Sequence, residues 1–141
     1  MAQAGPIVII DDDPDDMSFC QEVFKTIGLP NPLECFNKPH DALHYLRSCS
    51  VPPFIIFVDV KMPRMNGLEF QKQIETNAEL KNKSIPLIFF TGVHDPITIR
   101  EAYKNVIQGY FMKPSTMEEM VKLFTEIISY WSKCQHPHMQ A

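Results

Sequence analysis

The chain has 141 residues, 45% of them hydrophobic and 21% charged, which is the composition of an ordinary globular domain. Its 13 lysines and arginines against 17 aspartates and glutamates give a formal net charge of −4, and no basic run indicates nucleic-acid binding. No apolar run approaches the roughly 20 residues that span a bilayer, and the amino terminus lacks a signal-peptide pattern, so we expect no membrane partner.

The first predicted element is an apolar strand that runs straight into aspartates. Residues 6–10 (PIVII) are apolar throughout, and Asp11 and Asp12 follow directly. Like charges this close repel one another, so the pair needs solvent or a cation beside it.

The next aspartates have the pattern of a helix start. Asp13 is a good N-cap and Pro14 fits the first helical position. Asp15 and Asp16 suit the positive end of the helix dipole, and we expect them to form a solvated first turn. Gly28 is expected to end this helix.

Four further strands and four further helices are predicted along the chain. The strands are residues 33–36, 54–58, 86–90 and 107–112. The helices are residues 40–48, residues 66–76, the segment that opens at Asp95-Pro96, and a last helix begun by a capping box of Ser115 and Glu118. Because several strands are apolar almost throughout, the alternation predicts an α/β fold with a parallel sheet covered on both faces.

Polar side chains stand where the predicted strands end. They are Asp11 and Asp12, Asp59, Thr91 and Lys113. A doubly wound sheet gathers the carboxyl ends of its strands at one rim, so we expect these residues to converge there.

Such a group has the chemistry of a phosphoryl-binding site. Two carboxylates about 4 Å apart repel by about 4 kcal/mol at an effective dielectric constant near 20, so a cation is expected among them. Oxygen ligands suit Mg²⁺ or Mn²⁺, and the absence of cysteine and histidine from the group argues against zinc. A metal ion, an ammonium group and a hydroxyl donor together are what a phosphoryl group requires.

At this point the sequence resembles the receiver domains of two-component response regulators, from about residue 5 to 131. The resemblance rests on four motifs in order: IVIIDD, FIIFVDVKMPRMNG, PLIFFTG and GYFMKPS. It implies a doubly wound (βα)5 flavodoxin-like fold, whose five-stranded parallel sheet has the strand order 2-1-3-4-5 and helices on both faces. Residues 5–133 would be the receiver domain.

The resemblance also implies a role for each site residue. Asp59 would be the phospho-acceptor, and Asp12 and Asp59 would bind Mg²⁺ directly. Asp11 would lie nearby and act through water, and the backbone carbonyl of Lys61 would be a further ligand.

The remaining residues would bind the phosphoryl group or take part in the conformational switch. Lys113 would pair with Asp59 and then with the phosphoryl oxygens. Thr91 would bind the phosphoryl group and move toward it. Tyr110 matches the aromatic switch position, whose ring would turn inward when Thr91 moves, although it could also be a simple packed aromatic.

We therefore expect a stand-alone, cytoplasmic response regulator that is not an enzyme in the ordinary sense. It would take a phosphoryl group from a phosphohistidine on a sensor histidine kinase or a histidine phosphotransfer protein, and signal to a downstream protein that the sequence does not identify. One alternative is a receiver module excised from a larger hybrid kinase or regulator. A remote one is a haloacid-dehalogenase-type phosphatase, which would need an aspartate where Lys61 stands.

Two weaker features remain open. Tyr103, Tyr110, Leu123 and Tyr130 are candidates for a partner or homodimer surface on the last helix and fifth strand, but exposed apolar side chains are common without a role. Residues 134–141 carry Cys134, His136 and His138, which could bind a soft metal, but a disordered tail is the expectation. The four cysteines form no CxxC pair, as is typical of reduced thiols in the cytoplasm.

Overall fold

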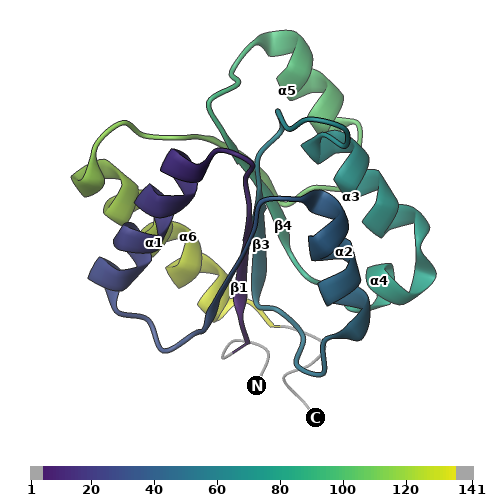
Figure 1. Cartoon of the computed structure of the whole chain (residues 1–141), viewed down its shortest axis with the longest axis horizontal. Coiled ribbons are helices and arrows are strands. Elements are labelled where there is room, and N and C mark those ends of the chain that lie inside the picture. Colours follow the sequence, from purple (N-terminus) through teal and green to yellow (C-terminus); the bar gives the residue numbers. More distant parts are fainter. Residues whose placement is uncertain (1–4, 136–141) are drawn as a thin grey trace.

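A computed structural model describes residues 5–135 and shows a five-stranded parallel sheet in the order β2-β1-β3-β4-β5 (Figure 1). The strands are β1 (Ile7–Ile10), β2 (Leu33–Phe36), β3 (Ile55–Val58), β4 (Leu87–Thr91) and β5 (Gly109–Met112). The predicted fold class and strand order are therefore confirmed. His136 and His138 and the rest of the expected tail beyond Gln135 lie outside the described residues.

Helices cover both faces of the sheet (Figure 1). The helices are α1 (Pro14–Ile27), α2 (Pro39–Ser48), α3 (Gly67–Thr76), α4 (Ala78–Asn82), α5 (Pro96–Tyr103) and α6 (Met117–Lys133). Helices α1 and α6 pack against each other on one face, and α2 to α5 lie on the other. Within residues 5–135, no helix combines the length and the apolar character needed to cross a membrane.

The core has two halves because successive strand residues point to opposite faces. Ile7 and Ile9 face α1 and α6, whereas Val8 and Ile10 face the side of α2 and α3. Phe124 of α6 stands at the centre of the first half. Its ring lies 4.7–4.9 Å, between centroids, from three other phenylalanine rings: Phe24, Phe57 and Phe90.

The start of α1 follows its sequence pattern closely. The Asp13 side chain accepts hydrogen bonds from the backbone N–H groups of Asp15 and Asp16, and Pro14 occupies the first turn. Gly28 ends the helix in the left-handed conformation, with φ at 74°, where a side chain would be strained.

One helix prediction was wrong, and one short helix was missed. The N-cap of α6 is Thr116, which accepts from the backbone N–H of Glu119 at 3.2 Å, rather than Ser115 with Glu118. Two hydroxyl residues and two glutamates stand side by side there, so the pattern fits in two registers. The short helix α4 was not predicted, because Asn77 ends α3 and caps α4 at once and leaves no loop to mark the boundary.

Candidate functional site

The site begins where the chain order of the sheet reverses, between β1 and β3. From β1 the chain goes to β2 on one side and later to β3 on the other, so their carboxyl ends open a crevice. Ile10 pairs with Val58 in register, and the backbone N–H of Asp59 donates to the carbonyl of Ile10 at 3.0 Å. Asp11 and Asp59 are therefore neighbours at the rim.

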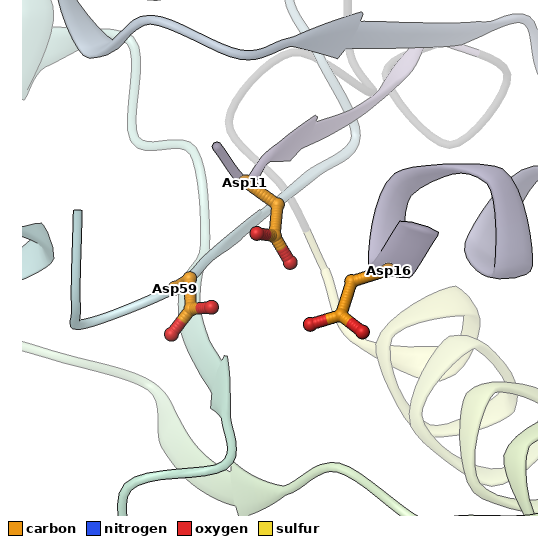
Figure 2. Close-up of side chains that lie close together, drawn as sticks. All are labelled: Asp11, Asp16 and Asp59. Carbon is orange, nitrogen blue, oxygen red and sulfur yellow. The ribbon is translucent and has the colours of Figure 1, made fainter. Parts of the chain in front are cut away.

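A third carboxylate reaches this rim from α1. Oxygen atoms of Asp11, Asp16 and Asp59 all lie within 4.8 Å of one another, and Figure 2 shows their side chains turned toward a common space. The expectation that Asp16 belongs to a solvated first turn is wrong. Helix side chains lean toward the N-terminus, and from the third helical position this direction leads back to the rim.

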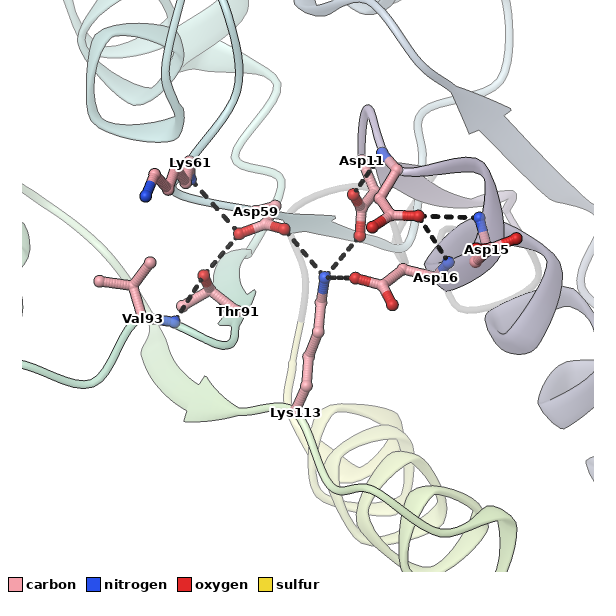
Figure 3. A network of polar contacts seen from close by, with 9 residues as sticks. Asp11, Asp15, Asp16, Asp59, Lys61, Thr91, Val93 and Lys113 are labelled. Carbon is pink, nitrogen blue, oxygen red and sulfur yellow. Dashed lines mark hydrogen bonds and ion pairs between the residues drawn. The ribbon is translucent and has the colours of Figure 1, made fainter.

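The ammonium group of Lys113 joins these three carboxylates (Figure 3). Its Nζ lies 2.6 Å from Asp11, 2.8 Å from Asp16 and 2.8 Å from Asp59. An ammonium group has three N–H donors, so each has a carboxylate acceptor. Burial by itself would lower the pKa of Lys113, but these hydrogen bonds outweigh it and raise the pKa above its usual range.

Asp11 is the most deeply buried of the three carboxylates that Lys113 contacts. Asp11 is 3% exposed, and burial raises its pKa despite the hydrogen bonds from Lys113 and from the backbone N–H of Asp13. Without a cation beside it, this carboxylate would be poorly solvated.

Both oxygens of Asp59 are held by hydrogen bonds (Figure 3). Lys113 donates to Oδ2, while the Thr91 hydroxyl donates to Oδ1 at 2.5 Å and the backbone N–H of Lys61 at 3.4 Å. Thr91 is fully buried at the end of β4. The carboxylate of Asp59 is thus fixed in one orientation by groups from three strand ends.

Gly67 allows α3 to start directly beneath this residue. A Cβ at position 67 would lie 2.3 Å from the carbonyl oxygen of Asp59 and 2.9 Å from the Cα of Val60. The backbone N–H of Gly67 instead donates to the carbonyl of Val60 at 2.8 Å. Only a residue without a side chain permits this approach.

Tyr110 connects β5 to the loop that follows Thr91. Its hydroxyl donates to the carbonyl of Val93 at 2.6 Å, and its ring packs against Phe89 with 5.9 Å between centroids. The backbone N–H of Val93 in turn donates to the Thr91 hydroxyl at 3.2 Å. Tyr110 is therefore two hydrogen bonds away from Thr91, and its role as a switch stays a prediction.

The site opens to solvent through a cleft of about 760 Å³. Asp12 lines this cleft and is exposed, as is Lys61, while Asp59, Thr91 and Lys113 form its inner wall. Asp12 does not belong to the group of three carboxylates that meet at Lys113. The expected convergence therefore holds for Asp11, Asp59, Thr91 and Lys113, and Asp12 stands at the mouth.

The donor set fits a small divalent cation. The acidic side chains at the cleft offer carboxylate oxygens, no cysteine or histidine among the described residues lines it, and hard cations such as Mg²⁺ and Mn²⁺ prefer oxygen ligands. The metal assignments of Asp11, Asp12, Asp59 and the Lys61 carbonyl stay predictions.

Comparison with known proteins agrees with this geometry. The family model for the response regulator receiver domain matches residues 7–125. The chain is 26% identical over 130 residues to the probable methanogenesis regulatory protein FilR2 of Methanothrix harundinacea, covering 89% of this chain and 82% of FilR2. It is 25% identical over 130 residues to the response regulator Rcp1 of Synechocystis sp., covering 89% of this chain and 87% of Rcp1.

Solved structures show the same fold. The phosphorylated cyanobacterial phytochrome response regulator RcpA superposes with a TM-score of 0.81 at 20% identity, over 94% of this chain and 97% of RcpA. The Mn²⁺-bound form of Rcp1 superposes with a TM-score of 0.75 at 24% identity, over 93% of this chain and 96% of Rcp1.

Proposed function

This chain belongs to the response regulator receiver domain family, and on that premise we propose that it is a phospho-accepting switch of a two-component phosphorelay. It takes a phosphoryl group from a phosphohistidine of a histidine kinase or phosphotransfer protein onto Asp59. One observation supports this assignment above all. Asp59 is a carboxylate in an open cleft, with Lys113 and Thr91 already hydrogen-bonded to its two oxygens.

The transfer needs little from the protein except position and charge. An oxygen of Asp59 forms the bond to phosphorus while the bond from phosphorus to the histidine nitrogen breaks, and that nitrogen keeps the electron pair. The Thr91 hydroxyl then donates to a phosphoryl oxygen instead of to the free carboxylate, and Lys113, which contacts the other oxygen of Asp59, gives a further N–H to the phosphoryl group. Slow hydrolysis of the acyl phosphate resets the site, so we propose a signalling switch rather than an enzyme with a free substrate.

We propose Mg²⁺, or Mn²⁺ in its place, as the metal of this site. Asp12 and Asp59 bind it directly, Asp11 acts through water, and the Lys61 carbonyl completes the protein ligands. The metal supplies positive charge against the phosphoryl oxygens. The oxygen-only donor set and the Mn²⁺-bound form of the similarly folded Rcp1 support this choice.

The switch follows from the added charge. Phosphorylation adds about −1.5 to −2 charges beside carboxylates that already repel one another. When Thr91 turns to the phosphoryl group, its hydrogen bond from Val93 is strained, and the loop that Tyr110 holds through Val93 must reorganise. The Tyr110 ring then changes position when Asp59 is phosphorylated, and this changes the surface at β5.

The phosphorylated protein signals by binding a partner protein in the cytoplasm. The surface around β5 and α6 is the proposed binding surface. β5 is an edge strand on which Met112 is exposed. Phe111, Leu123 and the exposed Tyr130 line a groove of about 420 Å³ between β5 and α6. A second copy of this chain fits such an edge, because both copies offer unpaired strand groups. Light scattering before and after phosphorylation tests for this dimer, and an unchanged monomer mass in both states would exclude it.

Labelling with acetyl phosphate tests the proposed function. Wild-type protein should take up one phosphoryl group per chain when Mg²⁺ is present and almost none in EDTA, and Asp59→Asn should take up none. Labelling that is independent of metal, or that survives in Asp59→Asn, would overturn the proposal.

A further inference from the structure

Asp16 gives Lys113 a contact that the proposed phosphotransfer does not require. Other residues are assigned as the phospho-acceptor, as the metal ligands and as the hydrogen-bond donors to the phosphoryl group. Yet the Asp16 carboxylate lies 2.8 Å from Lys113 Nζ, as close as Asp59 does. Asp16 comes from α1, so this contact ties the first helix to the end of β5 (Figure 3).

The contact takes up the last free donor of Lys113. Asp11, Asp16 and Asp59 accept one hydrogen bond each, which accounts for all three N–H groups. A phosphoryl group on Asp59 needs a donor from the same ammonium group. One existing hydrogen bond must therefore break before Lys113 can bind a new oxygen.

Asp16 is the acceptor that can be given up most easily. Its side chain is 44% exposed, whereas those of Asp11 and Asp59 are 3% and 11% exposed. A half-exposed carboxylate regains water when it loses its partner, but a buried one loses a hydrogen bond that water cannot replace.

We infer that Asp16 is a positioning residue that holds Lys113 between Asp11 and Asp59 in the unphosphorylated protein and releases it to the phosphoryl group. This inference rests on the proposed function. Asp16 and the incoming phosphoryl group would compete for one N–H of Lys113. The contact with Asp16 therefore keeps Lys113 in place before phosphorylation and slightly lowers the rate of phosphorylation.

Asp15 provides a matched control for the loss of charge. It is the preceding residue of the same helix turn, carries the same charge and is exposed, and no contact with Lys113 is recorded for it among the residues that the structure describes. Asp15→Asn and Asp16→Asn change the net charge equally and both keep the cap at Asp13. Any difference between the two variants therefore reports the contact with Lys113 and not the general field.

The first test measures phosphorylation by acetyl phosphate in Mg²⁺, at donor concentrations well below saturation. In Asp16→Asn a neutral amide oxygen replaces the charged acceptor and holds one N–H of Lys113 more weakly. We therefore expect the second-order rate constant to rise about two- to fivefold, as the loss of a partly exposed ion pair implies. Asp15→Asn should stay near the wild type, and Asp16→Glu, which can still reach Lys113, should return toward it.

The second test observes Lys113 directly in the unphosphorylated protein. The Nζ–H signal of a lysine held by three carboxylates exchanges slowly with water and is visible by nitrogen-15 NMR at low temperature. We expect this signal in wild type and Asp15→Asn, and much faster exchange in Asp16→Asn.

Equal rates and equal exchange in the Asp15→Asn and Asp16→Asn variants would overturn the inference. If the wild type takes no label at all, the proposed function fails and the release step fails with it. The NMR comparison still decides in that case whether Asp16 holds Lys113.

Discussion

The ammonium of Lys113 lies 2.8 Å from the carboxylate of Asp59, although 54 positions of sequence separate the two residues. The end of β5 is thereby bound to the end of β3 across β4. The same ammonium group also forms ion pairs with Asp11 and Asp16. In the part of the chain that the structure describes, Lys113 is the only cation paired with these three carboxylates.

Removing this cation should destabilise the metal-free protein. Lys113→Met keeps most of the unbranched side chain but leaves buried carboxylates without their cation, so the free energy of unfolding in EDTA should fall by about 3 kcal/mol. Mg²⁺ should restore part of the loss. Urea titration measures both values, with Lys61→Met as the control because Lys61 is exposed. A loss of stability no larger than in that control would contradict the role given to Lys113.

Magnesium should stabilise the folded protein through Asp12. Because the metal binds only the folded site, the melting temperature should rise with Mg²⁺ concentration, and Asp12→Ala should abolish the rise. Asp13→Asn is a useful comparison, since Asn also caps helices and should leave the metal response in place. If Asp12→Ala melts with an unchanged metal response, Asp12 is not a ligand, and the group of Asp11, Asp16 and Asp59 becomes the better candidate.

A methyl group at position 67 should disturb the backbone that carries Asp59. Gly67→Ala places its Cβ 2.3 Å from the Asp59 carbonyl oxygen, so either α3 or the loop must shift, at a cost of about 1–3 kcal/mol in unfolding free energy. Gly92→Ala is the matched control, because a Cβ there meets nothing within 4 Å. Thermal denaturation compares the two, and equal stability would argue against the close approach of α3.

The buried thiol of Cys20 should make stability fall at high pH. Burial raises its pKa to about 12, from an ordinary value of 9.0. Between these values the unfolded chain loses the proton that the native protein keeps, so the free energy of unfolding falls as pH rises from 9 toward 12. Urea titrations over this range should show a shallower fall in Cys20→Ala. Parallel curves for the two proteins would contradict it.

Much of this fold was predictable because local chemistry and tertiary structure agree. The apolar strand cores and the caps at Asp13 and Asp95 each specify their element without distant help. The rim position of Asp59 followed from the rule that strand ends converge. The cap of α6 was misassigned because Thr116 and Ser115 offer the same chemistry one position apart.

The contact between Asp16 and Lys113 was not predictable from spacing. Asp15 and Asp16 are both aspartates and lie in the same helical turn. Only the packing of α1 on the sheet decides which of the two faces the rim. The direction of side chains at a helix start was the one available signal, since a residue at the third position leans back over the preceding loop.

The most direct test is to locate the phosphoryl group chemically. Borohydride reduces an aspartyl phosphate to the alcohol, so protein labelled with acetyl phosphate and Mg²⁺ can be reduced, digested and sequenced by mass spectrometry. We expect the alcohol at position 59 alone, and none in Asp59→Asn. Reduction at Asp11, Asp12 or Asp16, or a phosphoryl group that resists borohydride, would contradict the assignment of Asp59 as the acceptor.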